Sequence, residues 1–364
     1  MKINFMDLQT QYLKHKEEID SEIAEVLGST IFIGGQKLED LEKNLASYVG
    51  VKHAIGCSSG TNALLLSLMA LNIGYGDEVI TTPFAFIATA EAIAFLGAKP
   101  IFVDIDKDSY NIDVTRIEVA ITERTKAIIP VSLYGQCAEM QAINEIAKKH
   151  DLAVIEDACQ SFGATYNGEK SCSLSTIGCT SFFPTSPLGA YGDGGAIFTD
   201  DDELATKIKM LLNHGQSERY KHKYIGINGR LDALQAAVLN VKLKYFKEEV
   251  KARDDIGSRY SDLLEDAEVI TPKIAENSTS VYAQYSIRVK DRDAMIEKLS
   301  SKEIPTAIYY PIPIHLQEAF LYLGYKEGDF PVSEEVSTQI ISLPMSPYLR
   351  ESEQDFIVKA IKTG

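Results

Sequence analysis

HAIGCSSGTNALLLSLMAL, residues 53–71, places a buried β-rich run, a tight polar turn and an apolar helix in direct succession. The turn would bring peptide N–H groups and the positive end of the helix dipole to one point, which is the usual construction of an anion site. Gly60 would let the backbone approach a phosphate closely, and Thr61 would add a hydroxyl group. Taken alone, the stretch favours the simpler interpretation of a helix cap with a tight turn.

Further β-rich runs follow, separated by helical sequence. They are EVITT, PIFVDI, KAIIPVSL, LAVIED and GAIFTD, at residues 78–82, 100–105, 126–133, 152–157 and 195–200. This alternation predicts a mostly parallel sheet wrapped by helices. Several runs are apolar throughout, which is typical of strands covered on both faces. The predicted fold class is α/β with a large, central sheet.

The pattern changes near residue 240, where a charged helical stretch leads into strand-like VYAQYSIRV at 281–289 and TAIYY at 306–310. An N-terminal helix is predicted over roughly Gln9 to Leu27. We therefore divide the chain into a large domain with an N-terminal helix, residues 1–245, and a smaller α+β C-terminal domain, residues 246–364. No Gly/Ser-rich linker separates them, so tight packing between the domains is expected.

Composition excludes several classes of protein. The chain of 364 residues carries 52 acidic and 36 basic side chains, for a net charge of −16, so nucleic acid is not an expected partner. No uncharged run reaches the roughly 18 residues of a membrane span, so no membrane partner is expected. The cysteines lack metal-ligand spacing and are typical of reduced core thiols in a cytoplasmic protein without a metal; they are Cys57, Cys137, Cys159, Cys172 and Cys179.

Two other segments carry candidate chemistry. IEDACQ, residues 155–160, ends a strand with the adjacent carboxylates of Glu156 and Asp157, and ligands of open parallel sheets bind beyond the carboxyl ends of the strands. A buried Asp157 beside a pyridine nitrogen would keep that nitrogen protonated and make the ring an electron sink; a helix-capping Asp is the alternative. SFFPTSPLGAYGDGG, residues 181–195, is a polar, glycine-rich turn between two strands.

These segments occur together in an order that resembles the DegT/DnrJ/EryC1/StrS family of sugar aminotransferases over nearly the whole chain. The blocks include GTNAL, TTPFAFIATAEAI, IEDACQSFGA, SFFPTSPLGAYGDGGAIFTDD, GINGRLDALQAA and YYPIPIHLQ. So many ordered blocks make a chance match improbable. The resemblance implies the fold-type I aminotransferase architecture, the cofactor pyridoxal 5′-phosphate (PLP), and a homodimer whose active site is shared between subunits.

The blocks VSLYGQCAEMQAINEIAKKH, ISLPMSPYL and SVYAQYSIRV carry a finer resemblance within the family. It implies transfer of an amino group, from L-glutamate, to the C3 keto group of a UDP-linked N-acetyl-hexuluronate. Such enzymes serve the synthesis of cell-surface polysaccharide, the O-antigen of lipopolysaccharide.

The resemblance also implies residue roles. At the cofactor these are Gly60, Thr61, Ser181 and the partner subunit's Asn228 on the phosphate, Phe86 stacked on the ring, Asp157 on the pyridine nitrogen and Gln160 near the 3-hydroxyl. At the sugar nucleotide they are Arg230, Tyr309, Tyr310 and, nearby, His315. The planar fork of Arg230 suits a uronate carboxylate, and an ion pair with Asp232 or another acid is its structural alternative. Relatives often carry His where this chain has Tyr309.

One position departs from the family pattern, because Ser186 occupies the place of the catalytic lysine. A serine hydroxyl cannot form an imine and is a very weak base at neutral pH. The flanking Thr185 and Pro187 offer no substitute, and Lys170 lies in a different loop. We therefore expect an inactive form that traps the external aldimine when PLP and the amino sugar are supplied.

The origin of Ser186 leaves three explanations open: a substitution introduced to trap an intermediate, a non-catalytic paralogue that binds PLP and a UDP-sugar, or a different chemistry such as sugar dehydration. The first is favoured because the other cofactor residues are retained. Dehydratase relatives that lack the lysine carry His, whose basicity serine does not share.

Overall fold

The computed structural model describes residues 3–363 and contains a seven-stranded sheet in the order β1-β9-β8-β5-β4-β2-β3. Only β9 runs antiparallel to its neighbours, so the predicted mostly parallel α/β sheet is confirmed. The strands are β1 (His53–Cys57), β2 (Glu78–Thr81), β3 (Lys99–Phe102), β4 (Thr125–Ile128), β5 (Ala153–Asp157), β8 (Ile177–Ser181) and β9 (Gly195–Thr199). All six predicted runs form strands, and β8 is added before the glycine-rich turn.

Helices cover both faces of the sheet because alternate side chains of each strand point to opposite sides. Ile55 and Ile197 enter a core cluster formed with α3 (Gly60–Ala70), α4 (Ala88–Phe95) and α6 (Asp202–Leu211). Ala54 and Phe198 enter a second cluster, formed with α2 (Gln36–Val49) and α7 (Ala233–Leu263). A third cluster lies under α5 (Met140–Lys149). The strands are therefore buried on both faces, as their apolar composition predicts.

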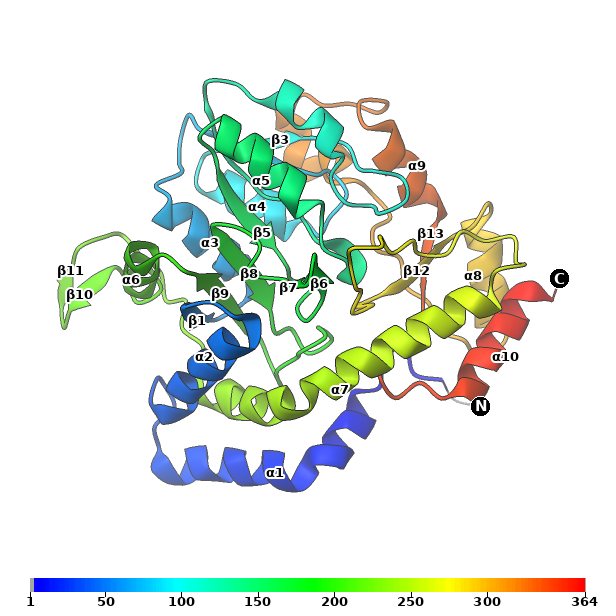
Figure 1. Cartoon of the computed structure of the whole chain (residues 1–364), viewed down its shortest axis with the longest axis horizontal. Helices are drawn as coiled ribbons and strands as arrows, with labels where there is room; N and C mark the ends of the chain where they lie inside the picture. The colour runs from blue at the N-terminus through cyan, green and yellow to red at the C-terminus, as the bar shows by residue number, and fades with distance from the viewer. Residues whose placement is uncertain (1–2, 364) are drawn as a thin grey trace.

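The long helix α7 runs from beneath the sheet to the C-terminal part of the chain, and α1 (Leu8–Ser29) lies along it (Figure 1). The N-terminal helix is thus confirmed. The proposed division at 245/246 falls inside α7 and stays a prediction. The chain near its N-terminus also contacts the C-terminal part, because the Met345 N–H donates to the Phe5 carbonyl over 3.0 Å.

The C-terminal part contains an antiparallel pair, β12 (Tyr285–Arg288) with β13 (Ile340–Leu343). It packs with α8 (Arg292–Ser300) and α10 (Glu351–Lys362) around the buried Tyr260 and Tyr285. The expected strand at 306–310 is wrong: only Ala307 forms a bridge, to Ser342, and the chain then turns toward the large sheet. Ala307 pairs with the edge of β13 that β12 leaves free, and the pairing ends there because the chain continues to Ile314, whose N–H donates to the Pro83 carbonyl after β2 over 2.7 Å.

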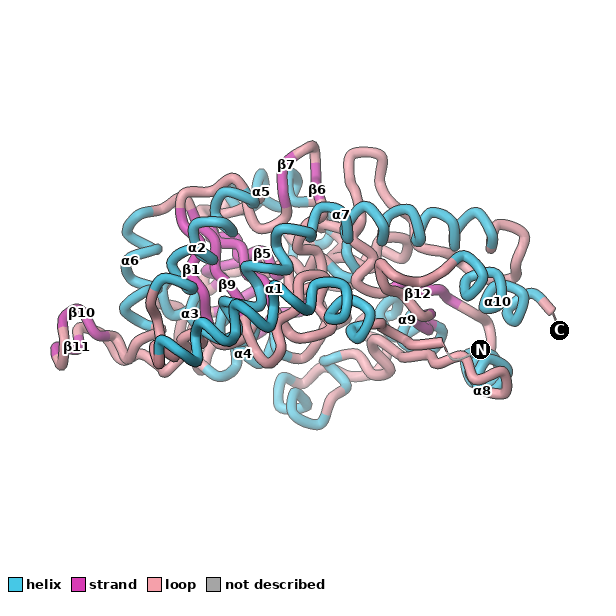
Figure 2. Tube along the Cα trace, turned by 90° about the horizontal axis from the view of Figure 1, so that it is seen from below, coloured by secondary structure: helices cyan, strands magenta, loops and turns pink. Residues whose placement is uncertain are grey.

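The remaining elements are short connections around this frame. They are η1 (Val114–Arg116), η2 (Glu118–Ala120), η3 (Leu133–Gly135), β6 (Thr165–Tyr166), β7 (Glu169–Lys170), β10 (Gln216–Glu218), β11 (Lys221–His222), η4 (Ile314–Leu316), η5 (Glu318–Leu323) and α9 (Pro331–Gln339). The β10–β11 hairpin projects away from the body of the molecule (Figures 1 and 2). Within residues 3–363, no helix has the length and apolar character needed to cross a membrane.

The two parts of the chain are joined by a buried carboxylate. Asp104, just after β3, accepts hydrogen bonds from the Val332 and Ser333 N–H groups at the start of α9, each over 2.9 Å. The Ser333 hydroxyl donates to the same carboxylate over 2.6 Å. A negative charge at a helix N-terminus is stabilising, so Asp104 fastens α9 to the edge of the large sheet.

Lys242 of α7 is an unusual core residue, since only 2% of it is exposed. Its ammonium donates to the Gly189 carbonyl over 2.7 Å and lies 4.3 Å from the centre of the Tyr191 ring. Burial lowers the pKa of Lys242 from 10.5 to about 8, and nearby Glu249 opposes the shift only in part. The folded protein therefore pays for burying this charge at neutral pH.

Replacing Lys242 should change how stability depends on pH. Below about pH 8 the amine is protonated in both the folded and the unfolded chain; between there and 10.5 the folded state loses its proton first. The free energy of unfolding, relative to Lys242→Met, should therefore rise across this window by roughly 3 kcal/mol. Urea unfolding at several pH values measures this. Lys244→Met, an exposed position on the same helix, is the control, and parallel curves for parent and Lys242→Met would refute the expectation.

Candidate active site

The turn before α3 is built for close approach of an anion. Ser59 caps the helix, its hydroxyl accepting from the Asn62 N–H over 3.1 Å, and the first peptide N–H groups of a helix have no intrahelical partner. A Cβ added to Gly60 would lie 2.8 Å from Ser181 Cβ and 2.8 Å from Cys159 Sγ. The predicted phosphate residues Gly60, Thr61 and Ser181 therefore come together, with Cys159 between them and Asp157.

Asp157 ends β5, the central strand, and is 5% exposed. Thr89 Oγ1 donates to its carboxylate over 2.7 Å and the Cys159 N–H donates over 3.2 Å. Burial raises the pKa of Asp157, and the Thr89 hydrogen bond opposes that shift. The described residues offer this carboxylate no cationic partner, so a protonated ring nitrogen beside it would supply the charge that the site lacks.

The neighbouring acid, Glu156, faces the other side of the sheet. It is fully buried and accepts from the Ser171 hydroxyl and the Cys172 N–H, both over 2.9 Å. Burial raises the pKa of Glu156 to about 7. Adjacent strand residues point in opposite directions, which separates the two carboxylates that the sequence placed side by side.

An aromatic and amide wall stands next to Asp157. Phe86 is 55% exposed, and its ring centre lies 6.1 Å from that of Tyr310. The Gln160 amide nitrogen donates to the Tyr310 hydroxyl over 3.1 Å, and its oxygen accepts from the Tyr134 N–H over 2.8 Å. An exposed Phe86 beside this wall is available to stack on a ligand ring.

Ser186 lies in the turn after β8, part exposed, where its N–H donates to the Phe183 carbonyl over 2.8 Å. The turn is closed by backbone contacts: a Cβ on Gly189 would lie 2.3 Å from the Pro184 carbonyl oxygen. Lys242, which the sequence did not single out, reaches the same turn through the Gly189 carbonyl. Lys170 instead lies over the Tyr48 ring, 4.6 Å from its centre, as expected for a residue of another loop.

Arg230 lies beside the phosphate turn of the same chain, whereas the exposed Asn228 forms an isolated bridge with Asn213. Arg230 forms an isolated bridge with Cys57, and the Ser58 N–H donates to the Gly229 carbonyl over 2.9 Å. Arg230 Nη1 donates to Asn213 Oδ1 over 2.7 Å, and its buried Nε has no partner within residues 3–363. The alternative ion pair with Asp232 is not formed, and the part-exposed guanidinium pairs with no carboxylate among the described residues.

The remaining predicted substrate residues differ in exposure: Tyr309 and Tyr310 border the site, whereas His315 is buried away from solvent. Tyr309 and Tyr310 are part buried and reach the wall beside Gln160. His315 is fully buried; its Nε2 lies 3.0 Å from Glu334 Oε1 and its ring packs edge-on against Phe330. His315 therefore has no exposed surface to offer a ligand in this arrangement.

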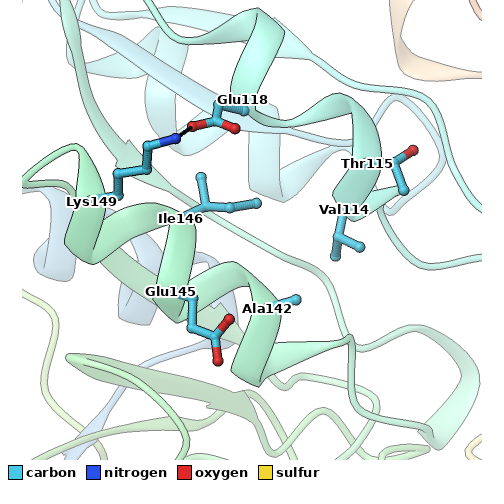
Figure 3. A pocket seen from close by; sticks show the side chains of 7 residues that line it. All are labelled: Val114, Thr115, Glu118, Ala142, Glu145, Ile146 and Lys149. Atoms are coloured by element: carbon cyan, nitrogen blue, oxygen red, sulfur yellow. Dashed lines mark hydrogen bonds and ion pairs between the residues drawn. The ribbon is translucent and has the colours of Figure 1, made fainter.

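A separate pocket, with a volume of about 270 Å³, lies between η1, η2 and α5 (Figure 3). Its side chains include an ion pair between Lys149 and Glu118, and it shares no residue with the candidate site. It is an open surface hollow, and Asp157 does not line it.

Three residues of the site were missed by sequence reasoning. Thr89 lies inside the TTPFAFIATAEAI block and Tyr134 inside VSLYGQC, but neither block indicates which side chain points inward. Lys242 lies in a charged helix where exposure is the ordinary expectation. The roles of these three residues become visible only in the structure, where Thr89 contacts Asp157, Tyr134 contacts Gln160 and Tyr309, and Lys242 contacts Gly189.

The site and the sheet together define a class of enzyme. A phosphate cradle, an exposed aromatic ring and a buried carboxylate that lacks a cation match the three parts of PLP, so the residues present fit this cofactor except at position 186. The protein is a PLP-dependent aminotransferase by fold and site. The DegT/DnrJ/EryC1/StrS aminotransferase family profile matches residues 13–362, and the chain belongs to this family.

Similar proteins span the full length of the chain. It is 50% identical over 359 residues to UDP-2-acetamido-2-deoxy-3-oxo-D-glucuronate aminotransferase of Pseudomonas aeruginosa, covering 99% of each chain. It is 48% identical over 364 residues to the pleiotropic regulatory protein of Geobacillus stearothermophilus, covering 99% and 98%. The structure of NtdA from Bacillus subtilis with bound cofactor PMP, the aminated form of PLP, superimposes with a TM-score of 0.91 at 34% identity, covering 99% of this chain and 84% of NtdA.

A methyl group at Gly60 tests the cradle. Gly60→Ala would force Cys159 and Ser181 apart, which costs roughly 1–3 kcal/mol of stability and fills the space for the phosphate. We expect a lower midpoint of thermal unfolding and a large loss of PLP affinity in a fluorescence titration. Gly28→Ala is the matched control, because nothing lies within 4 Å of its Cβ in α1. The free energy of unfolding of Gly28→Ala should rise by about 0.5–1 kcal/mol, and this variant should bind PLP normally. Normal PLP binding by Gly60→Ala would show that the phosphate binds elsewhere.

Proposed function

We propose that this site serves amino transfer from L-glutamate to the C3 keto group of a UDP-linked N-acetyl-hexuluronate, in the synthesis of cell-surface polysaccharide in the cytoplasm. The observation that carries the proposal is Arg230, whose part-exposed guanidinium lies beside the phosphate turn and pairs with no carboxylate within residues 3–363. A planar guanidinium suits a uronate carboxylate. The 50% identity to a Pseudomonas aeruginosa enzyme named for a 3-oxo-glucuronate supports the same substrate class.

The chain's own residues would divide the work as follows. Gly60, Thr61 and Ser181 bind the phosphate group, and Phe86 covers one face of the ring. Asp157 holds a positive charge at the ring nitrogen, which its burial makes favourable. When bound, PLP carries the amino group and withdraws electrons from the reacting carbon.

Ser186 cannot perform the remaining task, which is to take a proton from the substrate carbon and return it. A hydroxyl of ordinary basicity is not a proton acceptor at neutral pH, and it offers no amine to bond with the cofactor or release the product. Lys242 does not replace it, because its ammonium is bound to the Gly189 carbonyl in the core. We infer that this chain binds cofactor and sugar nucleotide but turns over very little.

A non-catalytic binding protein is the second candidate function. Ser186 favours it, and so does the 48% identity to a relative named as a pleiotropic regulatory protein. In that case the same residues would hold PLP and the sugar nucleotide as a sensor. A dehydratase is less well supported, because nothing at position 186 supplies a base.

We also propose a homodimer in which the partner subunit's Asn228 completes the phosphate site. Ile31, Phe32 and Ile33 are 44–56% exposed, and this segment lies on the start of α7, where the Ala233 N–H donates to the Phe32 carbonyl. Exposed apolar residues beside an incomplete polar site are typical of an interface. The projecting β10–β11 hairpin would reach onto the second copy.

Placing a lysine at position 186 distinguishes the aminotransferase from the non-catalytic binding protein. Ser186→Lys should transfer the amino group of L-glutamate to the UDP-3-keto-uronate at a rate at least about 100-fold above the parent chain, since proton transfer contributes this much. Ser186→Met, similar in length but without an amine, is the control and should stay inactive. The parent chain should keep PLP and the UDP-3-amino-uronate together through gel filtration, whereas Ser186→Lys should release them. An inactive Ser186→Lys protein that binds both ligands favours the sensor.

The proposed homodimer is tested by placing a charged side chain in the exposed apolar segment 31–33. Phe32→Glu should shift sedimentation velocity toward the monomer and weaken PLP retention, because a charge would have to be buried and the partner subunit's Asn228 would be lost. Tyr75→Glu is the control, since Tyr75 is 96% exposed in the turn before β2 and remote from this segment. A parent chain that sediments as a monomer with full PLP affinity would contradict the shared site.

A further inference from the structure

Tyr134 lies between Gln160 of the large sheet's loops and Tyr309 of the segment before η4. Its backbone is held in an uncommon conformation. Its φ is 58°, the left-handed region that residues other than glycine seldom adopt. Neighbouring contacts fix it there: the Leu133 N–H donates to Asn111 Oδ1 over 2.9 Å, and the Gly135 carbonyl accepts from the Val281 N–H over 3.0 Å. Such strain persists where surrounding structure determines the conformation, and it is frequent at functional sites.

The Tyr134 backbone sets the orientation of Gln160. The Tyr134 N–H can only donate, so the atom of Gln160 that faces it over 2.8 Å must be the amide oxygen. The amide nitrogen then faces Tyr310, to which it donates over 3.1 Å, and one of its two hydrogens remains for a ligand. Gln160 is therefore presented to the site as a donor, which suits an oxygen such as the cofactor's 3-hydroxyl.

The Tyr134 side chain contacts the segment that carries Tyr309 and Tyr310. It is buried, and its hydroxyl donates to the Tyr309 carbonyl. Burial raises the pKa of this phenol well above its ordinary value, so the donor hydrogen is retained. Tyr310 accepts from Gln160, which leaves its own hydroxyl hydrogen free to donate. Residues 134, 160, 309 and 310 thus form a closed ring of contacts between the large sheet and the segment before η4.

We propose that Tyr134 is a positioning residue with two separate tasks: its peptide N–H fixes Gln160 as a donor to the cofactor, and its hydroxyl fixes the Tyr309–Tyr310 segment for the sugar nucleotide. The proposal rests on the proposed function, which gives Gln160 and the two tyrosines their ligands. It goes further by assigning sugar affinity to a hydroxyl that itself touches neither ligand.

The two tasks can be separated because only one of them uses the side chain. Tyr134→Phe keeps the peptide N–H and the ring but leaves the Tyr309 carbonyl without its partner. Gln160→Leu keeps Tyr134 but removes the amide that bonds both the Tyr134 N–H and the Tyr310 hydroxyl. Tyr260→Phe is the matched control: Tyr260 is also buried and donates to a backbone carbonyl, that of Pro344 over 3.0 Å, but in the C-terminal core.

Calorimetry on the full chain with Ser186 in place measures both affinities without needing turnover. The probes are PLP, and UDP-2-acetamido-3-amino-2,3-dideoxy-glucuronate added to the PLP-bound protein. Tyr134→Phe should weaken binding of the sugar nucleotide roughly tenfold, as expected for a buried carbonyl left unpaired, and leave PLP affinity within about twofold. Gln160→Leu should weaken both, and adding Tyr134→Phe to it should change sugar affinity by less than in the parent. Tyr260→Phe should change neither.

Hydrogen exchange of the peptide over 305–310, in the PLP-bound protein, tests positioning without the sugar. Tyr134→Phe should raise exchange in this peptide several-fold, and Tyr260→Phe should not. If the parent chain fails to bind the sugar nucleotide but exchange still rises in Tyr134→Phe, the proposed substrate is wrong and the positioning role holds. Unchanged exchange, or unchanged sugar affinity in a parent chain that binds the sugar, would overturn the proposal for Tyr134.

Discussion

The carboxylate of Asp157 is the group around which the rest of the site is arranged. It ends the central strand, where Val131 bridges to it from the segment after β4, and the fold removes it from water with two hydrogen bonds and no cation among the described residues. A buried carboxylate in this state is raised in pKa and costs free energy when ionised. A cationic ring nitrogen relieves that cost. The same burial that makes an ionised Asp157 costly without a cation therefore makes the end of β5 selective for a pyridinium.

How far the sequence predicts this structure depends on the range of the interactions involved. Apolar runs define the sheet strands, and the anion turn at Gly60 follows from a strand, a glycine and a helix in succession, so these are local. The reversal of β9 and the absence of a strand at 306–310 depend on which strands pair, and no local pattern specifies pairing. The orientation of Gln160 depends on Tyr134, 26 residues away in sequence. Individual roles at the site consequently rest on the family resemblance and remain predictions.

Some polar residues of the large sheet's loops hold the two parts of the chain together. Asp104, in the PIFVDI run, accepts from the first N–H groups of α9, and Asn111 donates to the Gln136 carbonyl over 3.2 Å while accepting from the Leu133 N–H. Through these contacts the loops after β3 and β4 are fixed to each other and to the C-terminal part. Because Tyr309 and Tyr310 come from that part, the shape of the site depends on docking as much as on the residues that line it.

The turn that carries Ser186 shows why a change at this position alters chemistry without altering the fold. The turn is closed by main-chain hydrogen bonds from Ser186 and Ala190 to the carbonyls of Phe183 and Phe182, by the close approach of Gly189 to Pro184, and by Lys242 from below. None of these contacts uses the side chain of residue 186. A lysine, a serine or a methionine there would leave the same turn, the same cradle at Gly60 and the same carboxylate at Asp157. A change of residue 186 alone would therefore leave the surrounding binding residues in place, because the contacts that hold them are made by the main chain and by other side chains.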